Sequence, residues 1–396
     1  MGEAPSSALN ANRKKIGSKL NKLGLYIHIP FCRRKCPYCD FYSVTLEKEL
    51  KDRYMVAIYK EIKFLSQKFM PHWQADSLYF GGGTPSLLHP GEVEKMINFC
   101  QRHFNLTEGA EITLEANPDT VNWTKLKGYR SAGVNRLSLG IQSFNNEELK
   151  LLGRLHSCQK ALRAYEQTCK AGFENINLDL MIGLPHQKLE QWQSSLKQAA
   201  QLKPQHFSTY ILQIKDESYW GKEPPSALPS EELIEEMYYW GIDFLTGEGY
   251  RHYEISNFAL PDFLSYHNLK YWSGGAYLGL GAAAHSCDGK FRYNNPSDVY
   301  QYIQLIERFG SAWENKIALS PKMMLEEALF LGLRKTEGLE LKPFQQKYGI
   351  DILNRFSQEI SRLCDAGLIE ISNGFVKLSR KGLLLSNEVF QAFLLD

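Results

Sequence analysis

Short apolar runs alternate with longer amphipathic segments between residue 24 and about residue 212. The short runs are rich in β-branched and aromatic residues and predict strands at residues 25–29, 77–80, 111–115, 136–139, 175–180 and 207–212. The segments between them repeat apolar residues at helical spacing and predict helices at residues 47–67, 90–103, 120–132, 158–171 and 189–202. Strand followed by helix, repeated about six times, predicts an α/β fold with a parallel sheet, and a curved sheet of this kind is a partial (β/α)6 barrel of the TIM type. Ligands of such sheets bind at the carboxyl ends of the strands.

The alternation ends after residue 212. Residues 215–229 contain three prolines, residues 231–247 predict an acidic helix, and residues 251–286 mix short strands with aromatic residues and glycines. This region indicates an extension that caps or widens the sheet. From residue 321 helical patterns return, including helices at 341–348 and 350–366.

Two short apolar runs then flank Asn373 and Gly374, a dipeptide typical of hairpin turns, and a last helix is expected at 380–394. Helices followed by a small β-wing are typical of a winged-helix module. We therefore predict a basic leader at 1–23, a core at 24–215, an extension at 216–320 and a C-terminal domain at 321–396.

Composition places the chain among soluble proteins. Its hydrophobic content is 43%, and no apolar run reaches the ~18 residues that a membrane-spanning helix needs. We expect a cytoplasmic protein, and a net charge of +2 gives no general attraction to nucleic acid. The leader carries five basic residues around Ile16, Leu20 and Leu23, which suits either a solvated tail or a peripheral contact at a membrane surface.

Three of the eight cysteines, Cys32, Cys36 and Cys39, lie at CxxxCxxC spacing directly after the first strand. Three thiolates at this spacing can hold three corners of an iron–sulfur cube and leave the fourth iron open. A structural zinc site usually has four protein ligands, and here Asp40 and His28 are the nearest other donors. The pattern therefore favours a cluster over zinc.

The second predicted strand ends in YFGGGTPS at residues 79–86. Glycines at a strand end let the backbone approach a ligand closely. The cysteine motif after one strand and the glycine motif after the next resemble the radical S-adenosylmethionine (SAM) superfamily. This resemblance implies a [4Fe–4S] cluster on the three cysteines and SAM at the open iron, where an electron from the cluster cleaves SAM to methionine and a 5′-deoxyadenosyl radical.

Further strand ends resemble the oxygen-independent coproporphyrinogen oxidase family position by position, in LEANP, GIQSF, GRLHS and NLDLMIGLP. The resemblance implies that Arg154 binds the methionine carboxylate and that Glu115, Gln142 and Asp179 accept hydrogen bonds from ribose or the amino group. The complete set of expected SAM contacts is Tyr26, Tyr38, Gly82, Gly83, Thr84, Glu115, Gln142, Arg154, Asp179 and Gln213. At Gln213 the family carries a small residue, so this sequence departs from the pattern there.

Two branches share this architecture. True oxidases carry a further cysteine two residues after the third cluster ligand, where this chain has Phe41. The HemW haem chaperone branch instead carries HNxxYW, which matches His267 to Trp272 here. That resemblance implies His267 as the axial haem ligand, with Tyr271 and Trp272 flanking it. His285 is a second candidate, and the alternative for His267 is a hydrogen-bonded polar residue beside an aromatic core.

We therefore expect a haem chaperone that binds haem and a SAM-coordinating [4Fe–4S] cluster and passes haem to respiratory or other haem proteins, with an electron donor for the cluster as a further partner. The main alternative is a coproporphyrinogen III oxidase, against which Phe41 argues. A nucleic-acid-binding role for the C-terminal domain lacks the basic face that phosphate binding requires.

Overall fold

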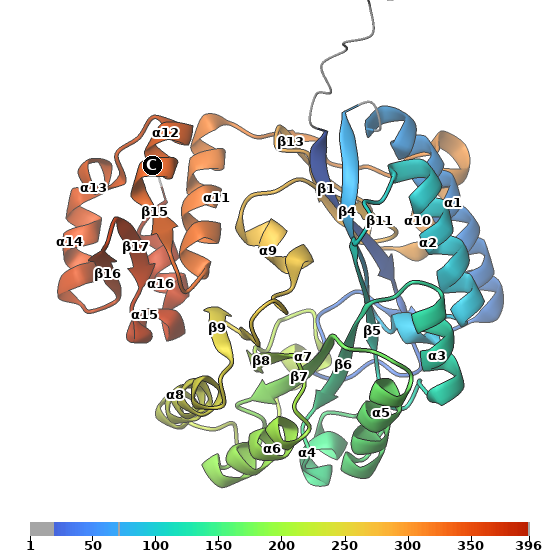
Figure 1. Ribbon diagram of the computed structural model, residues 1–396, viewed down its shortest axis with the longest axis horizontal. Helices are drawn as coiled ribbons and strands as arrows, with labels where there is room; N and C mark the ends of the chain where they lie inside the picture. Colours follow the sequence, from blue (N-terminus) through green and yellow to red (C-terminus); the bar gives the residue numbers. More distant parts are fainter. Residues whose placement is uncertain (1–19, 70–71, 395–396) are drawn as a thin grey trace, which may run out of the picture.

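The computed structural model describes residues 20–69 and 72–394 of the chain. Its main sheet contains neighbouring parallel strands in the order in which they occur in the sequence (Figure 1). These strands are β1 (Asn21–Ile29), β4 (Trp73–Gly82), β5 (Glu111–Ala116), β6 (Arg136–Gln142), β7 (Ile176–Ile182) and β8 (His206–Ile211). The six predicted strands are confirmed, with bounds that differ by a few residues.

Helices connect these strands and lie along the outer face of the curved sheet (Figure 1). They are α1 (Lys48–Phe69), α2 (Pro90–Phe104), α3 (Trp123–Ser131), α4 (Asn146–Leu151), α5 (Cys158–Lys170) and α6 (Leu189–Gln201). Five were predicted, and the short α4 was not. Ser157 caps α5 by accepting a hydrogen bond from the Lys160 amide, which satisfies one of the free donors of the first turn.

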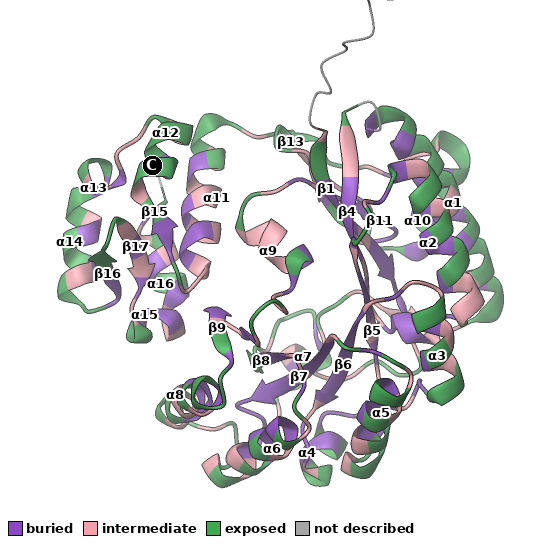
Figure 2. Ribbon diagram, viewed as in Figure 1, coloured by how far each residue is buried: buried purple, intermediate pink, exposed green. Residues whose placement is uncertain are grey.

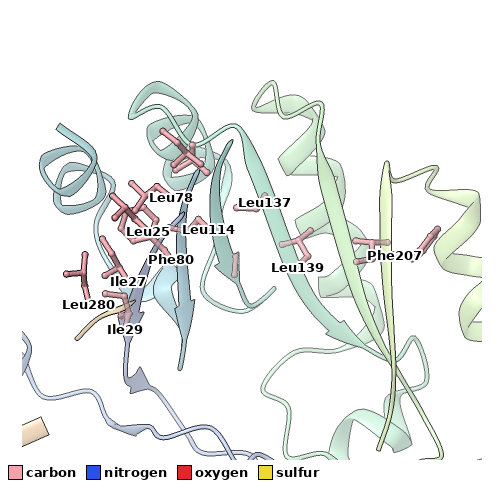
Figure 3. Packing of buried hydrophobic residues seen from close by; sticks show 14 of the residues in the cluster. Leu25, Ile27, Ile29, Leu78, Phe80, Leu114, Leu137, Leu139, Phe207 and Leu280 are labelled. Carbon is pink, nitrogen blue, oxygen red and sulfur yellow. The ribbon is translucent and has the colours of Figure 1, made fainter. Parts of the chain in front are cut away.

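The hydrophobic core lies between the sheet and these helices. Alternate strand residues such as Ile27, Leu78, Leu114 and Leu137 are fully buried and face the helices (Figure 3). The helices show buried residues on their inner faces and exposed residues outside (Figure 2). Because strand side chains alternate between faces, the residues next to these core positions along each strand face the barrel interior. Polar groups lie on that interior face.

The extension widens the sheet at both edges, as predicted. On the β1 side the sheet continues through β11 (Tyr277–Leu280), β12 (His285–Cys287), β13 (Phe291–Asn294) and β14 (Ile317–Ala318), and on the β8 side through β10 (Asn257–Ala259) and β9 (Arg251–Glu254). The strand β11 runs parallel to β1, so the parallel part of the sheet is one strand wider than the six-strand barrel that we expected.

Four helices lie in this part of the described chain. The acidic helix α8 (Glu231–Gly247) has the predicted bounds, and α10 (Val299–Phe309) packs on α1. The short helix α7 (Tyr219–Lys222) lies in the proline-containing segment. The helix α9 (Tyr266–Trp272) lies between β4 and the C-terminal domain and carries the HNxxYW motif (Figure 1).

The C-terminal part combines helices with a small three-stranded sheet in the order β15-β17-β16. Its elements are α11 (Pro321–Arg334), β15 (Leu339–Glu340), α12 (Leu341–Tyr348), α13 (Ile352–Arg355), α14 (Ser357–Asp365), β16 (Ile369–Ser372), β17 (Phe375–Leu378), α15 (Arg380–Leu384) and α16 (Ser386–Gln391). Asn373 and Gly374 both have positive φ, as the predicted hairpin turn requires. An ion pair of 2.8 Å between Arg334 and the buried Glu254 joins this part to β9.

Two helix predictions in this part were wrong in one respect each. The helix expected at 350–366 breaks at Phe356, whose ring is buried against Phe393 with 5.3 Å between centroids. The last helix breaks at Leu385 and ends earlier than expected. In the first case a tertiary contact overrides the local helical pattern, which is a common limit of propensity arguments.

No helix within residues 20–69 and 72–394 is both long and apolar enough to cross a membrane. Most of the predicted basic leader, residues 1–19, lies outside the described residues. The division into four segments stays a prediction.

Candidate functional site

The cysteine loop leaves the carboxyl end of β1. Cys32 ends β2 (Phe31–Cys32), which pairs with β3 (Val44–Thr45) in parallel. The amides of Val44 and Leu46 donate to the carbonyls of Pro30 and Cys32 at 2.7 and 3.0 Å, so both ends of the loop are fixed. All three motif cysteines are half-buried free thiols.

These thiols lie close enough to influence one another. Burial raises the pKa of Cys39 to about 11, with a smaller contribution from the neighbouring Cys36 and Cys32 thiols. Around one tetrahedral zinc ion the sulfurs would lie about 3.8 Å apart, given Zn–S bonds of about 2.3 Å. Among the described residues, however, no three His, Cys, Asp or Glu side chains are arranged to hold a single ion. A [4Fe–4S] cube would bind each cysteine at a different iron, so the three thiolates need not converge on one point.

The glycine loop at the end of β4 packs directly against the cysteine loop. A Cβ atom at Gly83 would lie 2.8 Å from the Phe31 carbonyl oxygen and 3.0 Å from Cys32 Sγ. Gly82 has a φ of +111°, which only glycine adopts readily. The Thr84 hydroxyl lies 3.5 Å from Cys32 Sγ. The predicted residues Gly82, Gly83 and Thr84 therefore lie beside the first cluster cysteine.

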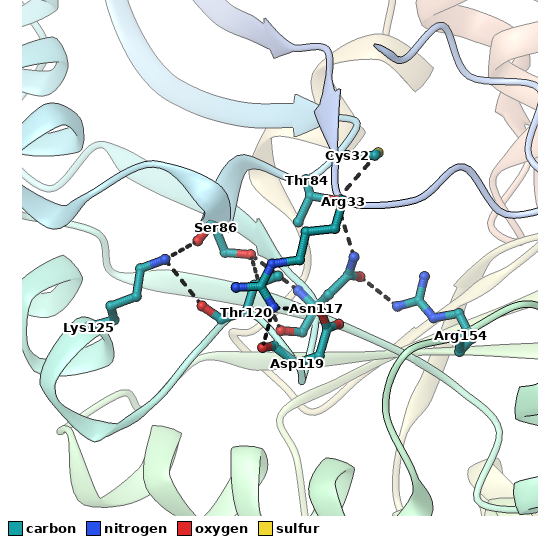
Figure 4. A network of polar contacts seen from close by, with 9 residues as sticks. All are labelled: Cys32, Arg33, Thr84, Ser86, Asn117, Asp119, Thr120, Lys125 and Arg154. Carbon is teal, nitrogen blue, oxygen red and sulfur yellow. Dashed lines mark hydrogen bonds and ion pairs between the residues drawn. The ribbon is translucent and has the colours of Figure 1, made fainter. Parts of the chain in front are cut away.

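Arg154 joins the cluster loop to two strand ends. Its Nη2 donates to Asn117 Oδ1 at 2.6 Å (Figure 4). The same nitrogen donates to the Gly140 carbonyl at 2.6 Å, and Nη1 lies 3.8 Å from Cys36 Sγ. Its buried Nε has no hydrogen-bond partner among the described residues. A small pocket bounded by Arg154, Cys36 and Asn117 opens here. An unpaired guanidinium nitrogen beside a pocket suits the predicted contact with a ligand carboxylate.

The predicted acceptors Glu115 and Asp179 lie inside the barrel. Glu115 accepts hydrogen bonds from the Tyr79 hydroxyl at 2.9 Å and the Gly82 amide at 3.1 Å. Burial, followed by the charge of Asp179, raises the pKa of Glu115 to about 7. Asp179 accepts from the Ser138 hydroxyl at 3.0 Å and Asn177 Nδ2 at 2.8 Å, and burial raises its pKa.

The other predicted SAM contacts differ in how closely they join this group. Gln142 ends β6 with a φ of +70° at a register shift. Tyr26 lies on the barrel floor, where its hydroxyl is 3.1 Å from His28 Nδ1. Tyr38 packs near Trp220 with 6.1 Å between ring centroids. Gln213 is exposed just beyond β8, and within the described residues no hydrogen bond joins it to the other predicted SAM contacts.

The HNxxYW motif forms α9, and Ser265 caps its amino end. His267 is only 2% exposed. Its Nδ1 lies 2.9 Å from the Ser77 hydroxyl and its Nε2 lies 2.9 Å from the Tyr271 hydroxyl. Burial lowers the pKa of His267 to about 3, so the imidazole is neutral. Iron ligation at His267 therefore requires that one of these two hydrogen bonds is released.

The other residues of the haem prediction lie around α9 and β12. The guanidinium of Arg334 lies over the Trp272 ring at 4.2 Å, and Tyr271 packs edge-on against Tyr277. His285, the second candidate, is exposed on β12. His267 as a haem ligand stays a prediction.

Our sequence analysis missed polar residues that the structure places at this site. Asn117 links Arg154 to Thr84, to which its Nδ2 donates at 3.2 Å. Arg33 in the cluster loop donates to the Asp119 carboxylate at 3.3 Å (Figure 4). The signal for Asn117 and Asp119 was the run of polar residues directly after β5, where ligands of parallel sheets bind.

Family models and relatives agree with this geometry. A model of the radical SAM superfamily matches residues 26–199, and a model of the HemN C-terminal domain matches residues 319–385. The heme chaperone HemW of Bacillus subtilis is 37% identical over 374 residues, which cover 93% of this chain and 98% of that protein. The HemW of Escherichia coli is 41% identical over 67% of this chain and 70% of its own length.

A more distant relative and a solved structure match over similar lengths. The mitochondrial radical S-adenosyl methionine domain-containing protein 1 of Danio rerio is 31% identical over 96% of this chain and 89% of its own. The structure of coproporphyrinogen III oxidase (HemN) from Escherichia coli, a radical SAM enzyme, superposes with a TM-score of 0.84 at 26% identity, covering 95% of this chain and 90% of that one. This match confirms the predicted fold class.

The radical SAM match implies a [4Fe–4S] cluster and SAM as cofactors. Relatives that are more than 30% identical match over nearly the whole of both chains. This chain therefore belongs to the HemW haem chaperone family of the radical SAM superfamily.

Proposed function

We propose that this protein is a haem chaperone, which binds haem beside a SAM-coordinating [4Fe–4S] cluster and delivers haem to haem proteins. One structural observation carries the proposal. Tyr79 donates its hydroxyl to Glu115, a predicted SAM contact, while its ring stacks on His267 of the HNxxYW motif with 5.1 Å between centroids. The two predicted sites therefore share one side chain inside the barrel.

In this proposal Cys32, Cys36 and Cys39 hold the cluster. The cluster, when bound, supplies the open iron at which SAM coordinates and the electron for its cleavage. Gly82, Gly83 and Thr84 bring backbone groups to the ligand, and Arg154 pairs with its carboxylate. Glu115 and Asp179 accept hydrogen bonds from its donor groups. Tyr38 lies within the cluster loop and is half-buried, so it helps to exclude water there.

Haem binding would use the neutral imidazole of His267, since a neutral imidazole nitrogen is a usual iron ligand. The aromatic rings of Tyr79 and Tyr271 contact this residue, and Trp272 packs near Tyr271. These rings offer flat apolar surface to a macrocycle. Delivery to haem proteins is supported by the bacterial relatives, which are heme chaperones by name. An electron donor for the cluster and a membrane contact of the leader remain part of the proposal.

The test is a haem titration of the full chain, carried out anaerobically after cluster reconstitution. We expect the wild type to bind haem with a shifted Soret band. His267→Ala should bind haem at least about tenfold more weakly, since even loss of a group that orients a metal ligand costs about 10–100-fold in metal affinity. His285→Ala is the matched control, because His285 is exposed on β12. Unchanged haem binding in His267→Ala would remove His267 as the ligand.

Coproporphyrinogen III oxidase is the second candidate, because the HemN structure covers 95% of this chain. Against it, Phe41 occupies the position of the oxidases' additional cysteine, and its side chain is 62% exposed. We expect the reconstituted protein with SAM, a reductant and coproporphyrinogen to form no protoporphyrinogen. A clear yield of that product would favour the oxidase instead.

A further inference from the structure

Arg136 is a buried cation inside the barrel that no motif explains. It begins β6, is 2% exposed and pairs in register with Thr113 of β5. Its neighbours Leu137 and Leu139 belong to the core beneath the helices, whereas Ser138 bonds to Asp179 inside the barrel. Because strand side chains alternate, Arg136 faces the interior together with Ser138.

This guanidinium has no close counter-ion. Its Nε is buried without a hydrogen-bond partner among residues 20–69 and 72–394, and none of the ion pairs in those ranges includes Arg136. A buried charge is costly unless other groups compensate it. The charge of Arg136 therefore acts on carboxyl groups that lie beyond ion-pair distance in the barrel.

The charge of Arg136 shifts the pKa values of titratable groups on six elements. They are Tyr79 of β4, Glu115 of β5, Asp179 of β7, His206 of β8, Tyr253 of β9 and His267 of α9. His206 is held between Asn177 and the Tyr253 hydroxyl at 2.6 and 2.7 Å, and burial followed by Arg136 lowers its pKa, so it is neutral. The two acids in this set are the predicted SAM contacts Glu115 and Asp179.

Glu115 and Asp179 have raised pKa values, so both carboxyl groups ionise less readily than they would in water. Burial raises the pKa of each, and for Glu115 the charge of Asp179 adds to the effect. Arg136 acts in the opposite direction on both carboxyl groups. SAM carries a sulfonium and an ammonium group, so a site that binds it is stronger when its acids are charged.

We propose that Arg136 is a positioning residue of the SAM site, whose buried charge favours the ionised forms of Glu115 and Asp179, which attract the cationic ligand. The inference rests on the proposed function, because it assumes that SAM binds at these strand ends. It assigns Arg136 no contact with SAM. The residue acts through the two carboxylates, one layer of side chains nearer the barrel opening.

The test compares SAM binding of the reconstituted full chain at several pH values in the wild type, Arg136→Met and Arg136→Lys. Without the cation the two carboxyl groups become harder to ionise, and each unit of upward pKa shift costs about tenfold in affinity below that pKa. We expect Arg136→Met to bind SAM about tenfold more weakly than the wild type at about pH 6.5 and within about twofold of it at about pH 9. Arg136→Lys keeps the charge and should stay close to the wild type throughout.

The pH profile separates this role from a structural one. A merely damaged barrel would lose affinity equally at every pH, and that result would overturn the inference. Arg130→Met is the control, because Arg130 is exposed on α3 and should leave SAM binding unchanged. If Arg136→Met does not fold, Arg136→Gln gives the same comparison. If neither neutral variant folds, the residue is structural and the inference is overturned. Failure of the wild type to bind SAM would instead contradict the proposed function.

Discussion

The imidazole of His267 stacks on the ring of Tyr79 with 5.1 Å between centroids and an interplanar angle of 29°. The residues are 188 positions apart, yet Tyr79 also bonds to Glu115 at 2.9 Å. One aromatic side chain therefore contacts the haem motif with its face and the predicted SAM site with its hydroxyl.

Removal of the Tyr79 hydroxyl should separate these two roles. In Tyr79→Phe the stacking on His267 remains, but Glu115 loses a buried hydrogen bond, which costs about 1–3 kcal/mol. We expect SAM affinity, measured by equilibrium dialysis of the reconstituted protein, to fall about tenfold while haem affinity stays the same. An equal loss of haem affinity would contradict the separation.

Removal of the hydrogen bond between Tyr271 and His267 Nε2 should increase the affinity for haem. Tyr271→Phe removes the hydroxyl that lies 2.9 Å from His267 Nε2 and keeps the aromatic ring. Because an ordinary hydrogen bond contributes about 0.5–1.5 kcal/mol, haem affinity should rise about threefold to tenfold in a Soret titration. Tyr277→Phe is the matched control, since Tyr277 contacts the Tyr271 ring edge-on. Weaker haem binding in Tyr271→Phe would show that the tyrosine hydroxyl supports the bound state.

Local patterns predicted most of the fold because strand and helix periodicities are local properties. The six barrel strands and the helices α2, α8 and α12 follow from them within a residue or a few. The parallel pairing of β11 with β1 could not be predicted in this way, since it joins Gly24 to Tyr277, which lies 253 residues later in the sequence. The break at Phe356 has the same origin, because its cause is the distant Phe393.

The candidate site shows the same difference between residues that local patterns predict and residues that depend on distant contacts. Residues that follow strand ends, such as Glu115 and Asp179, could be predicted because parallel strands bring their carboxyl ends together. The role of Arg136 could not be predicted, since this residue begins its strand. The amino-acid sequence shows neither its burial nor its lack of a counter-ion among the described residues. The partners of His267 were equally hidden, because Ser77 lies 190 residues away.

The cluster prediction has a direct spectroscopic test. Cys36→Ser should lose the brown absorbance of the reconstituted [4Fe–4S] cluster, because two remaining thiolates hold a cube poorly. Cys169→Ser is the control, since Cys169 is an exposed thiol on α5 and should keep the colour. If the colour persists in Cys36→Ser, the cluster lies elsewhere.

Gly83 should tolerate no side chain. In Gly83→Ala the new methyl group would lie 2.8 Å from the Phe31 carbonyl oxygen, which is backbone and cannot move away easily. We expect less cluster per chain and at least about tenfold weaker SAM binding, measured by iron analysis and dialysis, because core crowding of this kind costs about 1–3 kcal/mol. Gly91→Ala is the control, because its nearest neighbour would lie 3.4 Å away. Normal cluster content and SAM binding in Gly83→Ala would contradict the close approach.

SAM binding by the wild type should depend on pH through Glu115. The pKa of this carboxyl group is raised to about 7 in the ligand-free protein, and only its ionised form attracts a cation. Affinity should therefore fall as the pH drops below about 7, by at most about tenfold per pH unit, and stay constant above it.

Glu115→Gln tests this assignment, because an amide cannot ionise. Its SAM affinity should be low and nearly independent of pH between about pH 6 and pH 8.5. Glu147→Gln, which changes an exposed glutamate with a 76% exposed side chain on α4, should keep the wild-type profile. If Glu115→Gln retains the wild-type slope, Asp179 is the group whose ionisation controls binding, since it is the second acid on which the charge of Arg136 acts.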